Sequence, residues 1–349
     1  MDSQEQKHQR RVRYKGTHPR NYKEKYKEHQ PEKYADTVAK VIQKGSTPAG
    51  MHISICVKEI LDFLQIRPGQ TGLDATLGYG GHTLKMLECL EGRGHIYALD
   101  VDPIEIVKTR ERLEQLGYGP EMLTVRQLNF ADIDQVAALA GPFDFVLADL
   151  GVSSMQIDNP DRGFSYKSNG PLDLRLNPEK GTTAAERLKD VTQEELRGML
   201  IENSDEPYAK EISEAVISEI RNGRAIDTTV RLQQVIGKAL LFIPADKRKE
   251  AVKKSCQRTF QALRIDVNSE FEVLYEFLEK LPDVLAPGGR AAILTFHSGE
   301  DRLVKKSFKR LLGEGVYREI STEVIRPSAE ECSMNSRARS TKMRWAIKA

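Results

Sequence analysis

The sequence predicts an α/β protein whose mainly parallel sheet is interrupted by a helical insertion. Between residues 53 and 151, short apolar segments alternate with helical ones, which is the pattern of a parallel sheet covered by helices. The alternation then stops, and residues 183–264 read as charged amphipathic helices with no strand between them. It resumes after residue 266, so we expect both halves to build one sheet.

The composition is that of an ordinary globular protein. The chain has 349 residues, of which 39% are hydrophobic and 30% charged, enough for one large domain or two smaller ones. No apolar run reaches the length of a membrane span, and no secretory signal opens the chain. The four cysteines form no CxxC pair, which favours neither disulfides nor zinc. We expect a cytoplasmic protein without a metal or a membrane partner.

Positive charge gathers in an arm at the start of the chain. Residues 1–48 hold 12 Lys and Arg against 6 Asp and Glu, a net +6, and the other residues hold 41 against 45, a net −4. Tyr14, Tyr22, Tyr26 and Tyr34 lie among these cations. Cations beside stacking rings suit a polyphosphate chain with exposed bases, and a solvated tail is the alternative.

The first half of the chain contains the helices and strands of the alternating pattern. A helix over residues 53–64 ends before the break at Pro68-Gly69, as its apolar spacing and the turn residues indicate. The elements expected after the break are a strand at 71–76, a glycine loop and helix at 77–92, a strand at 94–102, a helix at 103–117, and strands at 123–130 and 143–151.

The second half contains the insertion and the return of the sheet. A stretch rich in Gly, Pro, Asn and Asp precedes the helical region. The later elements are a helix at 267–285, a strand at 290–296, a helix at 303–313 and a strand at 342–348. The predicted division is an arm at 1–48, a first sheet part at 49–157, a helical insertion at 158–262 and a second sheet part at 263–349.

A glycine-rich loop follows the first strand. Gly78, Gly80 and Gly81 lie between Asp74 and His82. Ligands of open α/β sheets bind beyond the carboxyl ends of the strands, glycines let the backbone approach them, and the helix N-terminus behind the loop favours a carboxylate. A plain turn or a NAD site is the alternative for this loop alone.

Two acids at the end of the second strand point to an adenosine cofactor. Asp100 can accept both ribose hydroxyls, whereas Asp102 suits capping of the next helix. A nicotinamide-dependent dehydrogenase is the competing interpretation, but its usual G-x-G-x-x-G pattern is replaced here by G-Y-G-G-H. The GxxxxGK[ST] loop of ATP-binding proteins is missing as well.

Further candidates follow the later strands. Phe130 either stacks on an adenine or closes the core. Asp149 ends the central strand, where the reacting atom of a cofactor would lie, and buried strands seldom end in an unpaired acid; a cap on the following turn is the alternative. His297 lies on the same edge of the sheet, beside Ser298 and Asp301, which have the spacing of a capping box.

Seven segments together resemble one known family. In order, over about residues 50–345, they are DATLGYGGHT, ALDVDP, ADLGVSSMQID, DRGFSYKSNGPLDLRLNP, RTFQALRIDVN, PGGRAAILTFHSGEDRLVK and RPSAEECSMNSRARSTKMR. They are similar to those of the MraW-type bacterial 16S ribosomal RNA (cytosine-N(4))-methyltransferases. The resemblance implies a class I, Rossmann-like methyltransferase sheet with an inserted helical domain, and methyl transfer from S-adenosylmethionine to a cytosine amino nitrogen of 16S ribosomal RNA.

The resemblance also implies roles for individual residues. The implied contacts of the methionine part of the cofactor are Gly80, Gly81 and His82. Asp100 is implied for the ribose and Phe130 for the adenine. Asp149 and Gln156 would complete the pocket, and Asp74 and Gly78 of the glycine loop also belong to the expected cofactor site. Our hypothesis for catalysis is that Asp149 accepts an N–H bond of the target amine, with His297 assisting in proton removal.

The implied partner is 16S ribosomal RNA in the small ribosomal subunit, and a homodimer is left open. Cations and rings that suit an unstacked base or phosphates gather after residue 158 and near the C-terminus. They are Arg162, Phe164, Tyr166, Lys167, Arg175, Arg337 and Arg339. Each cation is otherwise a solvated surface charge.

The chain departs from the family pattern at a few positions. Met155, Gly299, Ser336 and Thr341 replace the usual residues of SSPQLD, HSLED and NPRARSA, and SDEPYAKEI lacks the usual glycine and acid–arginine pattern. The alternatives are therefore a paralogue that acts on a different RNA and a non-catalytic RNA-binding protein.

Overall fold

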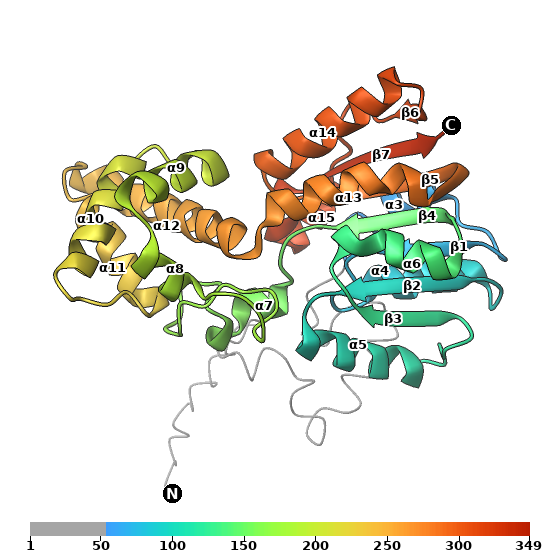
Figure 1. The fold of residues 1–349 in the computed structure, drawn as a ribbon, viewed down its shortest axis with the longest axis horizontal. Helices are drawn as coiled ribbons and strands as arrows, with labels where there is room; N and C mark the ends of the chain where they lie inside the picture. Colours follow the sequence, from blue (N-terminus) through green and yellow to red (C-terminus); the bar gives the residue numbers. More distant parts are fainter. Residues whose placement is uncertain (1–53) are drawn as a thin grey trace, which may run out of the picture.

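The computed structural model describes residues 54–349, which form a sheet domain and a helical part beside it (Figure 1). The predictions made for residues 1–48 lie outside the described residues. Within the described residues, no helix is both long and apolar enough to cross a bilayer.

Seven strands form one mixed sheet in the order β3-β2-β1-β4-β5-β7-β6. Strands β1 to β5 pair in parallel, and β7 lies antiparallel between β5 and β6. The strands are β1 Thr71–Asp74, β2 His95–Asp100, β3 Leu123–Gln127, β4 Phe143–Asp149, β5 Leu285–Thr295, β6 Tyr317–Ile320 and β7 Lys342–Lys348. Strand order reverses between β1 and β4, so their carboxyl ends flank the position where such sheets bind ligands.

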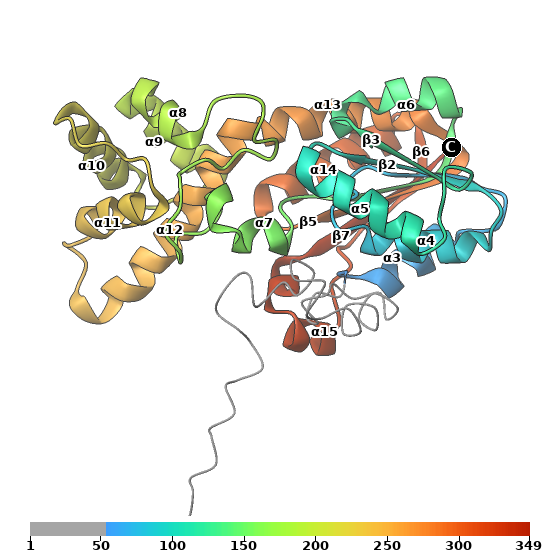
Figure 2. The same cartoon turned by 90° about the horizontal axis from the view of Figure 1, so that it is seen from below.

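Two sets of helices cover the two faces of the sheet (Figure 2). On one face lie α3 Val57–Leu64, α4 Gly81–Leu90 and α5 Pro103–Gln115, and on the other lie α6 Ile133–Ala140, α13 Glu270–Val284 and α14 Ser298–Gly313. Each set buries its apolar side chains in a separate core against the strands. The predicted α/β fold with a helical insertion is confirmed.

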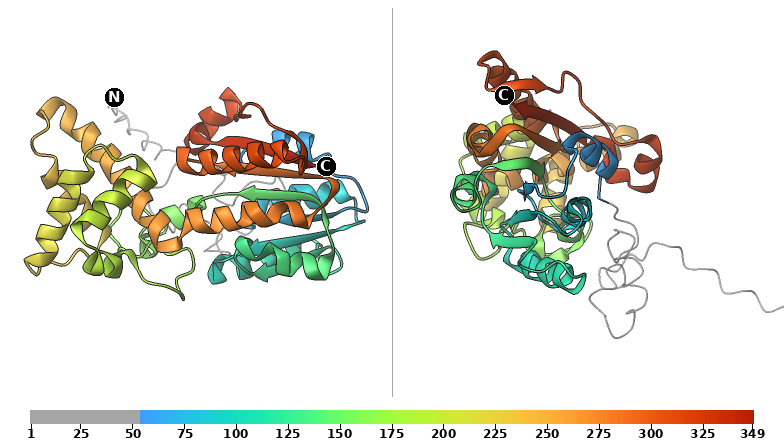
Figure 3. Two further views of the ribbon diagram at one scale, coloured as in Figure 1. Left: turned by 45° about the horizontal axis from the view of Figure 1, so that its top comes forward. Right: turned by 90° about the vertical axis from the view of Figure 1, so that its right-hand side faces the viewer.

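The insertion is a bundle with a hydrophobic core of its own. Its helices are α8 Ala184–Asp190, α9 Gln193–Ser204, α10 Ala209–Arg221, α11 Thr229–Ala239 and α12 Ala245–Asn268. Figure 3 shows the bundle beside the sheet and not over it. The predicted boundary after residue 262 falls inside the continuous helix α12, and the division into domains stays a prediction.

Several short elements complete the fold, some of them unexpected. They are α7 Ser154–Asp158, α15 Ala329–Met334 and the 3₁₀ turns η2 Phe130–Asp132, η3 Pro160–Arg162 and η4 Ser336–Ser340. Sequence analysis missed α6, which has 8 residues, and β6, which has 4.

Candidate active site

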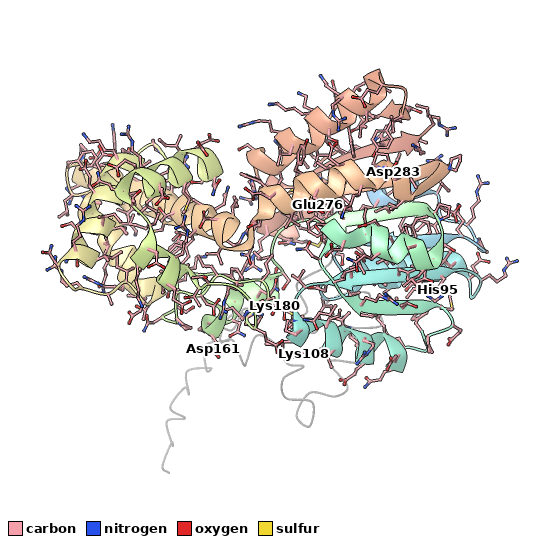
Figure 4. All side chains as sticks on the ribbon, viewed as in Figure 1. His95, Lys108, Asp161, Lys180, Glu276 and Asp283 are labelled. Atoms are coloured by element: carbon pink, nitrogen blue, oxygen red, sulfur yellow. The ribbon has the colours of Figure 1, made fainter. Side chains whose placement is uncertain are left out.

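A cavity of about 580 Å³ opens beyond the carboxyl ends of β1 to β4. Its volume is in the range of small-molecule sites. The sheet contributes a wall that includes Asp100, Phe130 and Asp149, and the opposite wall comes from the loop after η3 and from the junction of α12 and α13. Figure 4 shows Lys180, one of the lining residues, where the sheet domain and the insertion face each other.

The glycine loop between β1 and α4 is closely packed. The Gly78 N–H donates to Asp100 Oδ2 at 2.7 Å, and Gly78 and Gly80 have positive φ angles of 49° and 74°, which glycine adopts without strain. A Cβ on Gly81 would lie 2.0 Å from the Ser54 hydroxyl oxygen. The glycines thus hold the loop against the end of β2 and the start of α3, and their contact with a cofactor stays a prediction.

Asp74 lies behind the pocket wall. Its side chain is buried and accepts hydrogen bonds from the Thr83 hydroxyl at 2.6 Å and from the Thr76 N–H at 3.1 Å. The lining residues at this point are Ala75 and Thr76. In this structure Asp74 therefore orders the loop, and a direct bond from Asp74 to a cofactor stays a prediction.

The two acids at the carboxyl end of β2 have different surroundings, as their positions in the sequence suggest. Asp100 lines the cavity, and burial raises the pKa of its carboxyl to about 6. Asp102 is fully buried and caps α5, accepting from the Ile104 and Glu105 N–H groups at 3.0 and 3.3 Å. Of these two acids, Asp100 lines the cavity and Asp102 does not, and the contact of Asp100 with a ribose stays a prediction.

Phe130 lies between the cavity and the core, and its stacking on an adenine stays a prediction. Its ring lines the cavity beside Leu128 and Asn129. It also packs edge-on against Phe277 of α13, with ring centroids 5.2 Å apart. Packing holds the ring in place, so the face toward the cavity is ready to stack on a planar group.

Asp149 lines the cavity with a carboxylate whose two oxygens have different surroundings. Its Oδ2 lies 3.5 Å from His82 Nδ1, and its Oδ1 is buried with no hydrogen-bond partner among residues 54–349. Burial raises the pKa of Asp149 to about 6, an effect that His82 opposes and that Asp74 and Glu300 reinforce. A buried acceptor without a partner is costly in a folded protein, so Oδ1 is suited to a ligand.

Gln156 is fixed by the start of α7. It forms a capping box with Ser153, in which Gln156 Oε1 accepts from the Ser153 N–H at 2.9 Å and the Ser153 hydroxyl accepts from the Gln156 N–H at 3.1 Å. Its Nε2 donates to Asp102 Oδ2 at 2.8 Å. The side chain thus closes the cavity wall between β2 and β4.

The prediction of a Ser298–Asp301 capping box is wrong. His297 caps α14 instead, with Nδ1 accepting from the Glu300 N–H at 3.5 Å, and Asp301 pairs with Arg344 and Lys342. His297 Nε2 lies 3.2 Å from Glu300 Oε1. Both ring nitrogens thus face Glu300, which lines the cavity in place of His297. Removal of the substrate proton by His297 stays a prediction that this geometry does not favour.

Most of the side chains expected to meet RNA have protein partners. Arg162 is buried against Asp102, Arg175 pairs with Asp173 at 2.8 Å, and Arg337 donates to Asp158 at 3.0 Å. Phe164 and Tyr166 pack against the core of the insertion. Lys167 and Arg339 are exposed.

Sequence analysis missed the wall that the insertion contributes. Leu176, Asn177 and Lys180 line it, together with Asn268 and Glu270. Asn268 binds the loop, because its Oδ1 accepts from the Leu176 N–H at 2.7 Å and its Nδ2 donates to the Leu174 carbonyl at 2.8 Å. Asn268 is the last residue of the family-like segment RTFQALRIDVN, so that segment could have pointed to it.

Two groups of side chains could in principle hold a metal ion. They are Cys56 with Glu59 and Glu331, and Glu270 with His297 and Glu300. In the second group, Arg264 already neutralises Glu270 at 2.7 Å. In the first, Glu331 accepts from the Cys56 backbone N–H at 2.9 Å. The cavity chemistry described above uses neither group as a metal site.

The fold and the cavity together define a class I methyltransferase. Its marks here are an antiparallel strand inserted at the end of a parallel sheet, a glycine loop after β1, an acid after β2 and an aromatic ring after β3. Asp100 and the ring of Phe130 line the cavity, where an adenosine cofactor would fit. The reaction class is thus methyl transfer from S-adenosylmethionine.

The chain belongs to the MraW methylase family, whose model matches residues 49–349. It is 74% identical over 348 residues to "Ribosomal RNA small subunit methyltransferase H 1" of Lachnoclostridium phytofermentans, covering 100% of this chain and 95% of the relative. It is 70% identical over 349 residues to "Ribosomal RNA small subunit methyltransferase H 2" of Alkaliphilus metalliredigens, covering 100% of both.

The chain also has a slight likeness to solved structures. One is an rRNA methylase from Streptococcus thermophilus, with a TM-score of 0.39 and 14% identity over 85% of this chain and 98% of that one. This likeness is too low to carry an argument. Family membership confirms the resemblance described above, and the protein is an S-adenosylmethionine-dependent methyltransferase.

Proposed function

We propose that this methyltransferase modifies the exocyclic amino nitrogen of a cytosine in 16S ribosomal RNA. The names of its relatives support RNA of the small subunit as the substrate. The observation that carries the choice of an amino group is the unpartnered Asp149 Oδ1, because a carboxylate oxygen accepts N–H bonds. We further propose that the reaction takes place in the cytoplasm.

The target amine is a weak nucleophile, because its lone pair is delocalised into the cytosine ring. An N–H bond donated to Asp149 Oδ1 would localise the lone pair on nitrogen and aim it across the cavity. Positioning and fixed charge of this kind supply most of the rate in such sites. The backbone of residues 151–153 shapes the wall next to this carboxylate.

The cofactor supplies an electrophilic methyl group on a sulfonium. Among the residues present, Asp100 would hold the ribose, Phe130 would stack on the adenine, and Gln156 would close the wall between them. These assignments rest on the cavity lining and on the family resemblance.

The exposed cations that remain suit the RNA backbone. Lys167 lies in the loop after η3, ahead of the residues of that loop that line the cavity, and Arg339 lies in η4. Lys180 lies at the cavity wall, where a phosphate beside the target base would pass. The insertion is the proposed recognition part, since its loop and α12 both reach the cavity.

The decisive experiment compares the protein with its Asp149→Asn variant. Ribosomal RNA from cells lacking this protein would be incubated with each protein, and N4-methylcytidine would be measured by mass spectrometry of nucleosides. We expect the variant to keep cofactor affinity within a few fold and to lose methyl transfer by about a hundredfold or more, as when a positioned acceptor of this kind is removed. Normal turnover of the variant at saturating cofactor would remove Asp149 from the chemistry, and a methyl group on another nucleoside would overturn the cytosine target.

A further inference from the structure

His82 lies between a backbone carbonyl and the catalytic carboxylate. It belongs to the first turn of α4, and its side chain is 9% exposed. Its Nε2 lies 2.9 Å from the Ile55 carbonyl oxygen, and its Nδ1 lies 3.5 Å from Asp149 Oδ2. The two ring nitrogens therefore face two groups that can both act as acceptors.

The carbonyl fixes the hydrogen on one nitrogen. A carbonyl oxygen accepts and never donates, so Nε2 carries a hydrogen. A neutral ring would then present the lone pair of Nδ1 to Asp149 Oδ2. Two acceptors that face each other at a buried side chain are unfavourable, and a proton between Nδ1 and Oδ2 removes this conflict.

We propose that His82 and Asp149 hold one proton between Nδ1 and Oδ2, and that His82 is thereby the positioning residue that keeps Asp149 Oδ1 able to accept from the substrate. This catalytic consequence rests on the proposed function. When the C–N bond forms, the target nitrogen carries one proton too many. That N–H bond breaks, its proton passes to Asp149 Oδ1, and the pair releases a proton before the next turnover.

Several acidic groups surround His82 and Asp149. The acids that face the pair are Asp74 at the end of β1, Glu300 on α14 and Glu331 on α15. The Cys56 thiol, before the start of α3, also lies close to Asp149 and Glu331. A proton held between His82 and Asp149 would offset the repulsion between Asp149 and these acids.

The first test is the pH dependence of methyl transfer by His82→Gln. The glutamine amide can still donate to the Ile55 carbonyl, but it brings no proton to Asp149. Because a nearby cation lowers a carboxyl pKa, its loss raises the pKa of Asp149. The acid limb of the kcat profile should therefore move to higher pH by about one unit, with KM for RNA unchanged.

A rescue variant and a control variant accompany this test. His82→Asn places an amide N–H where Nδ1 was, and it should return part of the lost rate. His95→Gln is the matched control, because His95 lies on β2 at the end remote from the cavity and binds Glu121 and Thr124 (Figure 4). It should leave the profile unchanged. A His82→Gln profile that coincides with the wild type would overturn the proposal.

The second test needs neither RNA nor activity. Long-range ¹H–¹⁵N spectra of the full chain report which ring nitrogens of each histidine are protonated, and His82→Gln assigns the His82 signals. If the proton is shared, both ring nitrogens of His82 carry hydrogen in the wild type near pH 7, and this signature is lost in Asp149→Asn. Signals of a neutral ring near pH 7 that do not respond to Asp149→Asn would reject the shared proton, whatever the RNA substrate proves to be.

Discussion

Arg162 and Asp102 form a buried ion pair that joins the loop after α7 to the end of β2. The Arg162 Nη1 lies 2.6 Å from Asp102 Oδ2, and the two side chains are 8% and 0% exposed. The Arg162 Nη2 also donates to the carbonyls of Arg175 and Leu176, at 3.1 and 2.7 Å. One side chain thus ties the family-like segment DRGFSYKSNGPLDLRLNP to the sheet.

Arg162→Met should destabilise the protein strongly. It leaves the Asp102 carboxylate buried without its cation, which lowers the free energy of unfolding by about 3–5 kcal/mol. We expect a value near the lower end, because Gln156 Nε2 still donates a hydrogen bond to this carboxylate. Unfolding in urea, followed to the midpoint and slope, measures the loss. The control Arg339→Met, at an exposed position, should stay within about 0.5 kcal/mol. Equal midpoints for the two variants would mean that the pair contributes nothing.

Asp100→Ala should weaken S-adenosylmethionine binding about tenfold or more. Loss of a charge-assisted bond to the ribose costs about 1.5–3 kcal/mol, and loss of the bond from the Gly78 N–H loosens the loop as well. Isothermal titration calorimetry measures the affinity. Asp283→Ala serves as the control, because Asp283 lies near the end of α13 and away from the cavity (Figure 4). Unchanged affinity would take Asp100 out of the site.

Gly299 departs from the family pattern because Phe271 fills the space beside it. A Cβ at position 299 would lie 2.5 Å from the Phe271 ring. Gly299→Leu alone should therefore cost about 1–3 kcal/mol through overpacking. The double variant with Phe271→Leu should recover part of this loss. Thermal unfolding of the wild type, both single variants and the double variant gives the coupling, and additive effects would contradict the explanation.

Removal of residues 1–44 should leave cofactor affinity unchanged, because all the candidate cofactor residues named from the sequence come later, from Asp74 to Gln156. If the net +6 arm binds RNA, its loss weakens RNA binding and flattens the plot of log affinity against log salt, since fewer counterions are released. RNA affinity at several salt concentrations measures this. Coincident plots for both proteins would identify the arm as a solvated tail.

The positions of Asp100 and Asp149 at the cavity could be predicted because they depend only on where each acid stands in its own strand. Asp100 and Asp149 end strands, and parallel strands bring their carboxyl ends to one edge. The burial of Arg162 could not be predicted, since its partner Asp102 lies 60 positions earlier in the chain. A cation in a polar loop is normally expected to be exposed to solvent. The same holds for His297: Ser298 has the better capping chemistry, yet Glu300 hydrogen-bonds to the backbone of Phe296 and His297 and so starts α14 one residue earlier.

The wall from the insertion was unpredictable for a different reason. Asn268 and Glu270 belong to the end of one helix and the start of the next, and nothing in their spacing says which surface they face. Only the packing of α12 against the other helices of the bundle directs that junction into the cavity.

Helix α12 runs without interruption from Ala245 to Asn268, a length of about 36 Å. Its first turns belong to the outer end of the bundle, and its last residue holds the loop at Leu174 and Leu176. Because a continuous helix resists bending, the outer end of the bundle and the cavity loop at Leu174 and Leu176 are joined by one rigid element.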